Sequence, residues 1–324
     1  GEEIEEAVIS VPAYFHDEQR VAVKRAGALA GIHVERIVNE PSAAALASYF
    51  TANEEQNMLV FDFGGGTLDV SLVDCFDTMV EIVSVEGNNR LGGDDFDRLI
   101  AEHFLREHGV ARQQLRAQEY AVLLKQAERC KKLLSEQEEV VMHAMVGDQV
   151  YESTYTMDRL FEESKALLKE IRQVIGRALK DGKMTIHDVD LVVMAGGSSK
   201  MPLIQKYIRH LFHKAPMVQG NCDELIALGL GLVCGVKERK EEIKDYILTD
   251  ICPFSLGVAT INEADPDRAY MANIINRNTV LPCSRVRRFY TASDQQDYVV
   301  VEVHQGENTY AQDNLLLGKI EISV

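Results

Sequence analysis

The chain has 324 residues, of which 46% are hydrophobic, and carries a formal net charge of −17 at pH 7. A single core usually stops growing near about 250–300 residues, so this length predicts more than one core. The acidic balance argues against nucleic acid or an anionic membrane as a partner, because it repels phosphate groups. Any bound polyphosphate must therefore be held by backbone amides, a metal ion and a few placed lysines.

Six cysteines are scattered singly, without a C-x-x-C pair or a histidine at zinc-ligand spacing, and are interpreted as ordinary buried or half-buried thiols: Cys75, Cys130, Cys222, Cys234, Cys252 and Cys283. No run reaches the roughly 18 apolar residues of a membrane span, and no signal-peptide pattern opens the chain. These features predict a cytoplasmic protein. Because Gly1 comes just before a strand-like segment, we expect further sequence upstream.

The first part of the chain predicts strands alternating with helices. Short apolar runs at 7–11 and 33–38 predict strands, and alanine-rich stretches at 17–31 and 41–50 predict helices. Three consecutive strands follow at 58–63, 68–75 and 78–86, the first two joined by Gly64-Gly65-Gly66-Thr67. This is the pattern of a β-meander with a glycine tip.

The middle of the chain is predominantly helical. Periodicity predicts helices at 94–108, 113–135, 157–180, 202 onward and 223–239. A hairpin is predicted at 139–156, turning at Gly147-Asp148, and a strand at 190–195. From residue 251 the chain alternates β-branched and aromatic residues with polar turns, so we place a linker at 241–250 and an all-β domain after it.

The strongest chemical motif is the segment from Asp62 to Asp69, between two predicted strands. Its three glycines let consecutive backbone N–H groups converge on an anion. Asp62 and Asp69 can hold a hydrated Mg²⁺, and Thr67 can offer a hydroxyl to a terminal phosphate. The segment therefore indicates a phosphate-binding loop, with a plain glycine hairpin as the alternative.

Two further glycine turns each precede a predicted helix. Gly92-Gly93 is followed by Asp94, and Gly196-Gly197 is followed by Ser198 and Lys200. A helix N-terminus after such a turn can face an anion or a nucleoside, although a single turn of this kind more often reflects packing. The three turns together predict a nucleotide site.

The predicted helix at 113–135 carries Glu128, Lys131 or Lys132, and Ser135 on one face, at steps of three and four residues. That face can grip a ribose and base, and the alternative is a solvated charged face. Glu40 would be a surface carboxylate unless it lies near Asp62 across a cleft.

Five blocks in this order resemble the signature blocks of the DnaK-type seventy-kilodalton heat-shock chaperone family: residues 11–15, 39–45, 62–69, 91–97 and 195–202. The resemblance continues through Asp250, 253–257 and 305–308, and so spans essentially the whole chain. The segments 247–253, 277–279 and 284–286 look more like the HscC-like bacterial branch.

The resemblance implies an α/β fold: an actin-like (ribonuclease-H-like) ATPase lobe, a linker and part of an all-β sandwich domain. It makes 1–57 a remnant of nucleotide-binding lobe I, 58–240 lobe II, 241–250 the linker and 251–324 the first part of a peptide-binding domain. In the same way it implies ATP or ADP with Mg as cofactors.

The resemblance also implies roles for single residues. Asp62 and Glu40 would hold Mg through water, and Thr67 would act with them in catalysis. Nucleotide contacts would come from Gly64, Gly65, Gly66, Thr67, Gly92, Gly93, Asp94, Glu128, Lys131, Lys132, Ser135, Gly196, Gly197, Ser198, Lys200 and Asp223.

Other implied roles concern communication and peptide binding. Pro12 and Arg20 match a relay that reports the nucleotide state, Arg36 matches a J-domain docking position, and Asp250 matches an allosteric position at the end of the linker. The peptide channel would be lined by Val258, Ile261, Phe289, Ala292 and Val299.

The sequence departs from the family pattern in several places. Lys132 and Lys200 replace arginines that stack on adenine, Cys222 replaces a proline, and Thr249 interrupts the hydrophobic linker. The family's first phosphate loop and its phosphate-contacting lysine precede the region represented here. We therefore expect weak nucleotide binding and poor hydrolysis by this chain, because phosphoryl transfer needs groups on both sides of the nucleotide.

The function predicted on this basis is an ATP-dependent chaperone that couples Mg-ATP hydrolysis to binding and release of unfolded or extended peptide segments. A J-domain co-chaperone is a predicted partner, and the need for a nucleotide-exchange factor is left open. Two alternatives remain at this point: a small-molecule kinase or filament-forming ATPase of the actin-like fold, or a non-catalytic module that binds co-chaperones.

Overall fold

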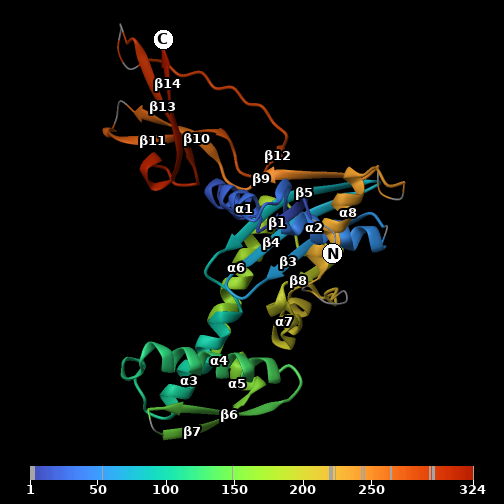
Figure 1. Ribbon diagram of the computed structural model, residues 1–324, viewed down its shortest axis with the longest axis vertical. Helices are drawn as coiled ribbons and strands as arrows, with labels where there is room; N and C mark the ends of the chain where they lie inside the picture. The colour runs from blue at the N-terminus through green and yellow to red at the C-terminus, as the bar shows by residue number, and fades with distance from the viewer. Residues whose placement is uncertain are drawn as a thin grey trace.

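The structure is a computed structural model that describes residues 4–52, 54–147, 149–218, 222, 224–241, 243, 245–262, 265–291, 293 and 296–323. It is a mixed α/β protein with four sheets in these ranges, as expected in class (Figure 1). Within the same ranges, no helix is long and apolar enough to cross a membrane. All six cysteines are free, and four of them are buried, which confirms their interpretation as ordinary thiols.

A six-stranded sheet with the order β12-β9-β5-β4-β3-β8 forms the centre of the molecule. The predicted meander is confirmed, because β3, β4 and β5 pair antiparallel. Bounds of these strands are β3 Gln56–Phe63, β4 Leu68–Phe76, β5 Met79–Asn88, β8 Leu191–Ala195, β9 Ile247–Cys252 and β12 Thr279–Leu281. The parallel neighbour β8 brings the turn after Ala195 to the end of β3, since Asp62 is paired with Ala195.

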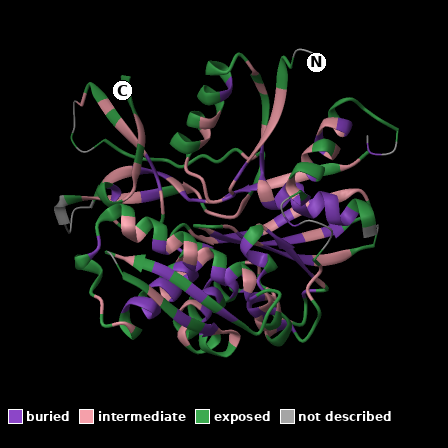
Figure 2. Cartoon of the chain, turned by 60° about the horizontal axis from the view of Figure 1, so that its bottom comes forward, coloured by how far each residue is buried: buried purple, intermediate pink, exposed green. Residues whose placement is uncertain are grey.

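Each face of the sheet has its own core, as the alternation of side chains along β3 requires. Leu59, Phe61 and Phe63 join the cluster that packs against α6 (Lys165–Asp181) and α7 (Pro202–Phe212). Met58 and Val60 join the cluster that packs against α2 (Glu40–Ala52) and α8 (Leu225–Lys237). Figure 2 shows the buried residues concentrated in this sheet and its covering helices.

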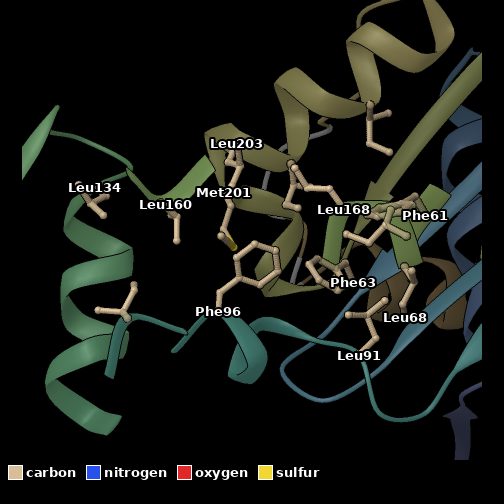
Figure 3. Close-up of a cluster of buried hydrophobic side chains, with 14 of the residues drawn as sticks. Phe61, Phe63, Leu68, Leu91, Phe96, Leu134, Leu160, Leu168, Met201 and Leu203 are labelled. Carbon is tan, nitrogen blue, oxygen red and sulfur yellow. The ribbon is translucent and has the colours of Figure 1, made fainter. Parts of the chain in front are cut away.

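A second unit extends from the core that contains Phe63 (Figure 1). It consists of α3 (Gly93–Glu107), α4 (Ala117–Leu133), α5 (Met157–Glu163) and the hairpin of β6 (Glu139–Val146) and β7 (Gln149–Thr156). The predicted hairpin is confirmed, although Asp148 lies outside the described residues. Phe96 of α3 packs edge-on against Phe63, with ring centroids 6.2 Å apart, so this unit and the sheet share one core (Figure 3).

Two predicted helices of this unit differ from the structure. The helix expected at 113–135 begins only at Ala117, after the 3-10 turn η1 (Arg112–Gln114), because Glu119 accepts a hydrogen bond from the backbone N of Arg116 and caps the helix there (2.8 Å). The helix expected at 157–180 is interrupted at Ser164. The hydroxyl of this fully buried serine donates to the backbone carbonyl of Phe161, which competes with regular helix hydrogen bonding.

The N-terminal segment forms a parallel pair of strands, β1 (Glu6–Val11) and β2 (His33–Asn39), joined by α1 (Asp17–Leu29). Val38 and Ala13 are buried with α2 and α8, so the pair is held against that side of the central sheet. The predicted elements of this segment are confirmed.

The C-terminal part is all β, as predicted, with one antiparallel sheet in the order β11-β10-β13-β14 and the short turn η3 (Ala311–Asp313). Its strands are β10 Leu256–Asn262, β11 Asp265–Ile275, β13 Tyr298–Gln305 and β14 Leu315–Ser323. The second layer that a sandwich requires stays a prediction.

The predicted linker does not behave as a free connector. Residues 247–252 form β9, which pairs parallel with β5 and antiparallel with β12. The predicted boundary between residues 250 and 251 therefore lies inside β9. Without β9, the edge of β5 would present unpaired backbone N–H and C=O groups, and the apolar end of the predicted linker forms hydrogen bonds with them. Thr249, the polar residue in the hydrophobic linker sequence, pairs with Glu81 inside this strand.

Candidate functional site

Two of the predicted glycine turns are bound to each other through their backbones. Gly93 N donates to Gly64 O at 3.0 Å, and Asp94 N donates to Gly65 O at 2.8 Å. A Cβ on Gly92 would lie 2.2 Å from Gly65 O, so only glycine permits this approach. The loop after β3 and the N-terminus of α3 therefore form one rigid unit.

The third glycine turn lies against the end of β3. Gly196 has φ +78°, and a Cβ there would lie 2.6 Å from Asp62 Oδ1. The following 3-10 turn, η2 (Gly197–Lys200), is held by Ser199, whose hydroxyl donates to Ala195 O at 2.5 Å. Asp62 and Gly196 thus face each other where β3 and β8 end.

These turns and α4 surround a cavity of about 540 Å³. Nine of the predicted nucleotide-contacting residues line it: Gly65, Asp94, Glu128, Lys131, Lys132, Ser135, Gly197, Ser198 and Lys200. Gly64, Gly66, Thr67, Gly92, Gly93 and Gly196 belong to the adjoining turns. The predicted contact Asp223 lies outside the described residues. Sequence reasoning missed Asp97 and Met201, which also line the cavity.

The predicted binding face of α4 is divided between two environments. Lys132 Nζ lies 2.6 Å from Glu128 Oε1, and both side chains are largely exposed, as in the alternative of a solvated charged face. Lys131 instead turns inward, where its Nζ lies 2.8 Å from Asp97 Oδ1 and donates to Gly93 O at 2.8 Å. The inward partner could not be identified from the spacing on α4, because Asp97 belongs to α3.

Three carboxylates gather where β3 and β4 meet the glycine loop. Asp62 and Asp69 are paired across the two strands, and Glu40 opens α2. Burial raises the pKa of Asp62 to about 6. Burial and the neighbouring charges of Asp62 and Glu40 raise the pKa of Asp69 to about 8. Burial and the charge of Asp62 raise the pKa of Glu40 to about 7, and its role at the site stays a prediction.

This acidic group fits a hydrated cation. Asp69 is 3% exposed, and its Oδ1 has no hydrogen-bond partner among the residues that the structure describes. In those same residues, no group of three or more metal-binding side chains is arranged to coordinate an ion directly. A divalent ion with its water shell would supply both the missing partner and the missing positive charge.

The predicted relay residue Arg20 and the predicted allosteric residue Asp250 are joined through Asn39. The Arg20 guanidinium donates to Asn39 Oδ1 at 2.7 Å, and Asn39 Nδ2 donates to Asp250 Oδ2 at 2.6 Å. Burial raises the pKa of Asp250, opposed by its hydrogen bonds and by Arg20. Pro12 follows β1, and Arg36 is exposed on β2. Asn39 was missed as a connector.

The C-terminal sheet is fixed to the rest of the chain through side chains that sequence reasoning did not single out. Arg277 contacts Glu86 of β5 and lies 2.7 Å from Asp181 at the end of α6. Phe254 packs against Tyr14 and His16, with ring centroids 4.5 and 4.2 Å away. These contacts reach Tyr14 and Glu86, which flank Gly87, and a Cβ on Gly87 would lie 2.8 Å from Asp69 Oδ1.

The predicted peptide-channel residues have different environments. Val258 on β10 is buried, whereas Ile261 on the same strand is 68% exposed. Val299 on β13 is half-buried, and Phe289 is partly exposed. Ala292 lies outside the described residues. Their joint role in a channel stays a prediction.

Comparisons with known proteins agree with the resemblance. Residues 1–324 match the family model described as "Hsp70 protein". The chaperone protein dnaK of Cyanophora paradoxa is 38% identical over 331 residues, an alignment that covers 99% of this chain and 52% of that protein. The chain therefore spans about half the length of this relative. Because the family model matches this chain over its whole length and the relative is 38% identical to it, the chain belongs to the Hsp70 family.

Proposed function

We propose that the chain is part of an ATP-dependent molecular chaperone of the actin-like ATPase fold. The observation that carries this proposal is the cavity where three glycine turns and the α4 face meet beside Asp62, Asp69 and Glu40. Backbone amides and lysines on one side suit an anionic nucleotide, and carboxylates on the other suit its cation. Family membership supports the same function.

Each part of the site has a separate task under this proposal. Glu128, Lys131 and Ser135 bind the nucleoside, and Lys132 and Lys200 lie on either side of its base. The N–H groups of Gly65, Gly66 and Thr67 bind the phosphates. Asp62 and Glu40 would hold a hydrated Mg²⁺ ion, which would supply charge neutralisation for phosphoryl transfer.

Coupling to peptide binding would run through β9. The strand joins the edge of the sheet whose other strands carry Asp62 and Asp69, and Asp250 within it is bonded to Asn39. A nucleotide that binds better when β9 is docked would shift the arrangement of the two domains, and with it the peptide affinity. Extended peptide segments would bind to the C-terminal sheet by main-chain hydrogen bonds and apolar pockets.

Partners are proposed on the same basis. A J-domain co-chaperone would dock near the exposed Arg36, and a nucleotide-exchange factor is a further candidate. Membership of the Hsp70 family does not favour the small-molecule kinase or filament-forming ATPase.

Calorimetric titration of the chain with ADP, with and without Mg²⁺, tests the proposal. We expect weak binding that strengthens with Mg²⁺, loses that dependence in Asp62→Asn, and is lost in Lys200→Ala. Asp158→Asn, on the exposed first turn of α5, is the matched control for charge. Binding that is identical in all four proteins would place the nucleotide elsewhere and contradict the proposal.

A further inference from the structure

Lys131 and Asp97 form a buried ion pair at the floor of the cavity. Their side chains are each 9% exposed, and Lys131 Nζ lies 2.8 Å from Asp97 Oδ1. The two residues come from different helices, α4 and α3. Burial raises the pKa of Asp97, and the ammonium of Lys131 opposes this effect. A buried pair of this kind survives only when further hydrogen bonds compensate the loss of water around both charges.

The geometry around Lys131 fixes the direction of its ammonium group. Besides this ion pair, Nζ donates a hydrogen bond to Gly93 O at 2.8 Å. A Cβ on Gly93 would lie 3.1 Å from Nζ and 2.2 Å from Ser198 Oγ, so the glycine leaves the space that the ammonium occupies. An ammonium has three N–H donors. With Asp97 and Gly93 as its partners among the described residues, Lys131 retains one N–H for the cavity that it lines.

The neighbours of that donor indicate what it meets. Glu128 lies three residues before Lys131 on α4, and Ser135 lies four residues after it in the turn that follows the helix; both line the same cavity. A carboxylate that accepts, an ammonium that donates and a hydroxyl that does both suit a polyhydroxylated ligand such as a ribose. A phosphate, by contrast, would be repelled by Glu128 and Asp97.

We infer that Asp97 is a positioning residue, which holds Lys131 so that its remaining N–H meets a ribose hydroxyl of the bound nucleotide. The inference rests on the proposed function. Asp97 acts through Lys131 and does not itself touch the ligand. Without the carboxylate, the flexible lysine side chain is free to leave this position, and the nucleotide loses a hydrogen bond to a charged group.

The test compares ADP with 2′,3′-dideoxy-ADP, which lacks both ribose hydroxyls, by calorimetry on the whole chain. Asp97→Asn is expected to weaken ADP binding about tenfold and dideoxy-ADP binding less than about twofold. Lys131→Met is expected to weaken the binding of the two ligands by the same factors. In the Lys131→Met background, Asp97→Asn is expected to weaken ADP binding by less than about twofold more. Glu102→Gln removes a charge from an exposed position of the same helix and is the control.

Two results would overturn the inference. One is unchanged ADP affinity in Asp97→Asn. The other is an equal loss for ADP and dideoxy-ADP that persists in the Lys131→Met background, because this indicates a general structural role. If Asp97→Asn alone does not fold, the double variant decides: a folded double variant that binds like Lys131→Met supports the inference, and an unfolded one contradicts it. A wild-type chain that binds no ADP refutes the proposed function itself, which is a distinguishable result.

Discussion

The raised pKa of Asp69 predicts that the folded chain becomes less stable as the pH rises, when no divalent cation is present. In the unfolded chain an aspartate loses its proton near pH 4, whereas burial and the charges of Asp62 and Glu40 raise the pKa of folded Asp69 to about 8. Between these values the folded state binds one proton more than the unfolded state. Stability therefore falls with rising pH across this window, and is fully present only below about pH 4.

The magnitude follows from the proton count. One extra proton in the folded state corresponds to about 1.4 kcal/mol of unfolding free energy per pH unit, so Asp69 alone accounts for about 3 kcal/mol between pH 5 and pH 7. Asp69→Asn keeps the shape of the side chain and removes its titration. We expect the variant to lose about 3 kcal/mol less than the wild type over this interval.

Urea unfolding at pH 5, 6 and 7 in the presence of a chelator measures the effect. Far-UV circular dichroism is the appropriate signal, because the chain has no Trp. Asp158→Asn, an exposed acidic position, is expected to retain the pH dependence of the wild type. Mg²⁺ at pH 7 should stabilise the wild type more than Asp69→Asn. An identical pH dependence in wild type and Asp69→Asn would refute the reasoning.

Two further substitutions test other contacts. Gly196→Ala places a side chain at φ +78° and brings its Cβ to 2.5 Å from Phe63 O, so we expect the free energy of unfolding in urea to fall by at least about 2 kcal/mol. For Gly66→Ala, whose Cβ meets no atom within 4 Å, the free energy of unfolding should fall by less than about 1 kcal/mol. Equal losses in the two variants would contradict the strain argument. Arg277→Lys removes the terminal guanidinium nitrogen that contacts both Glu86 and Asp181, so amide hydrogen exchange in β9 should rise about tenfold. Arg285→Lys at an exposed position should leave this exchange unchanged. Unchanged exchange in Arg277→Lys would mean that apolar packing around Phe254 alone holds the domains together.

Local sequence signals predicted the elements and the turns of the site well. The strands on both sides of Gly64 to Thr67 and the helices after Gly92-Gly93 and Pro202 depend on glycine, proline and hydrophobic spacing within a few residues. The misplaced helix ends have local causes too, but weaker ones: the cap formed by Glu119 and the buried hydroxyl of Ser164. Both compete with a helical pattern that continues on either side.

Contacts between distant residues could not be predicted in this way. The inward turn of Lys131 depends on Asp97, and neither spacing nor charge distinguishes Lys131 from Lys132 on the isolated helix. Asp69 could be named as a cation ligand from the loop, but its orphaned oxygen appears only in the fold. The addition of β9 to β5 and the contact between Arg277 and Glu86 both join segments that are far apart in the chain.

The most direct test of the central claim is photoaffinity labelling of the chain with 8-azido-ATP and Mg²⁺, followed by mapping of the modified peptide by mass spectrometry. We predict labelling within 128–135, at the end of α4 and in the turn after it, or within 197–201 at the third glycine turn, where the cavity receives the base. Unlabelled ADP should compete with this labelling. Labelling that excess ADP suppresses but that maps only outside these two segments would contradict the account.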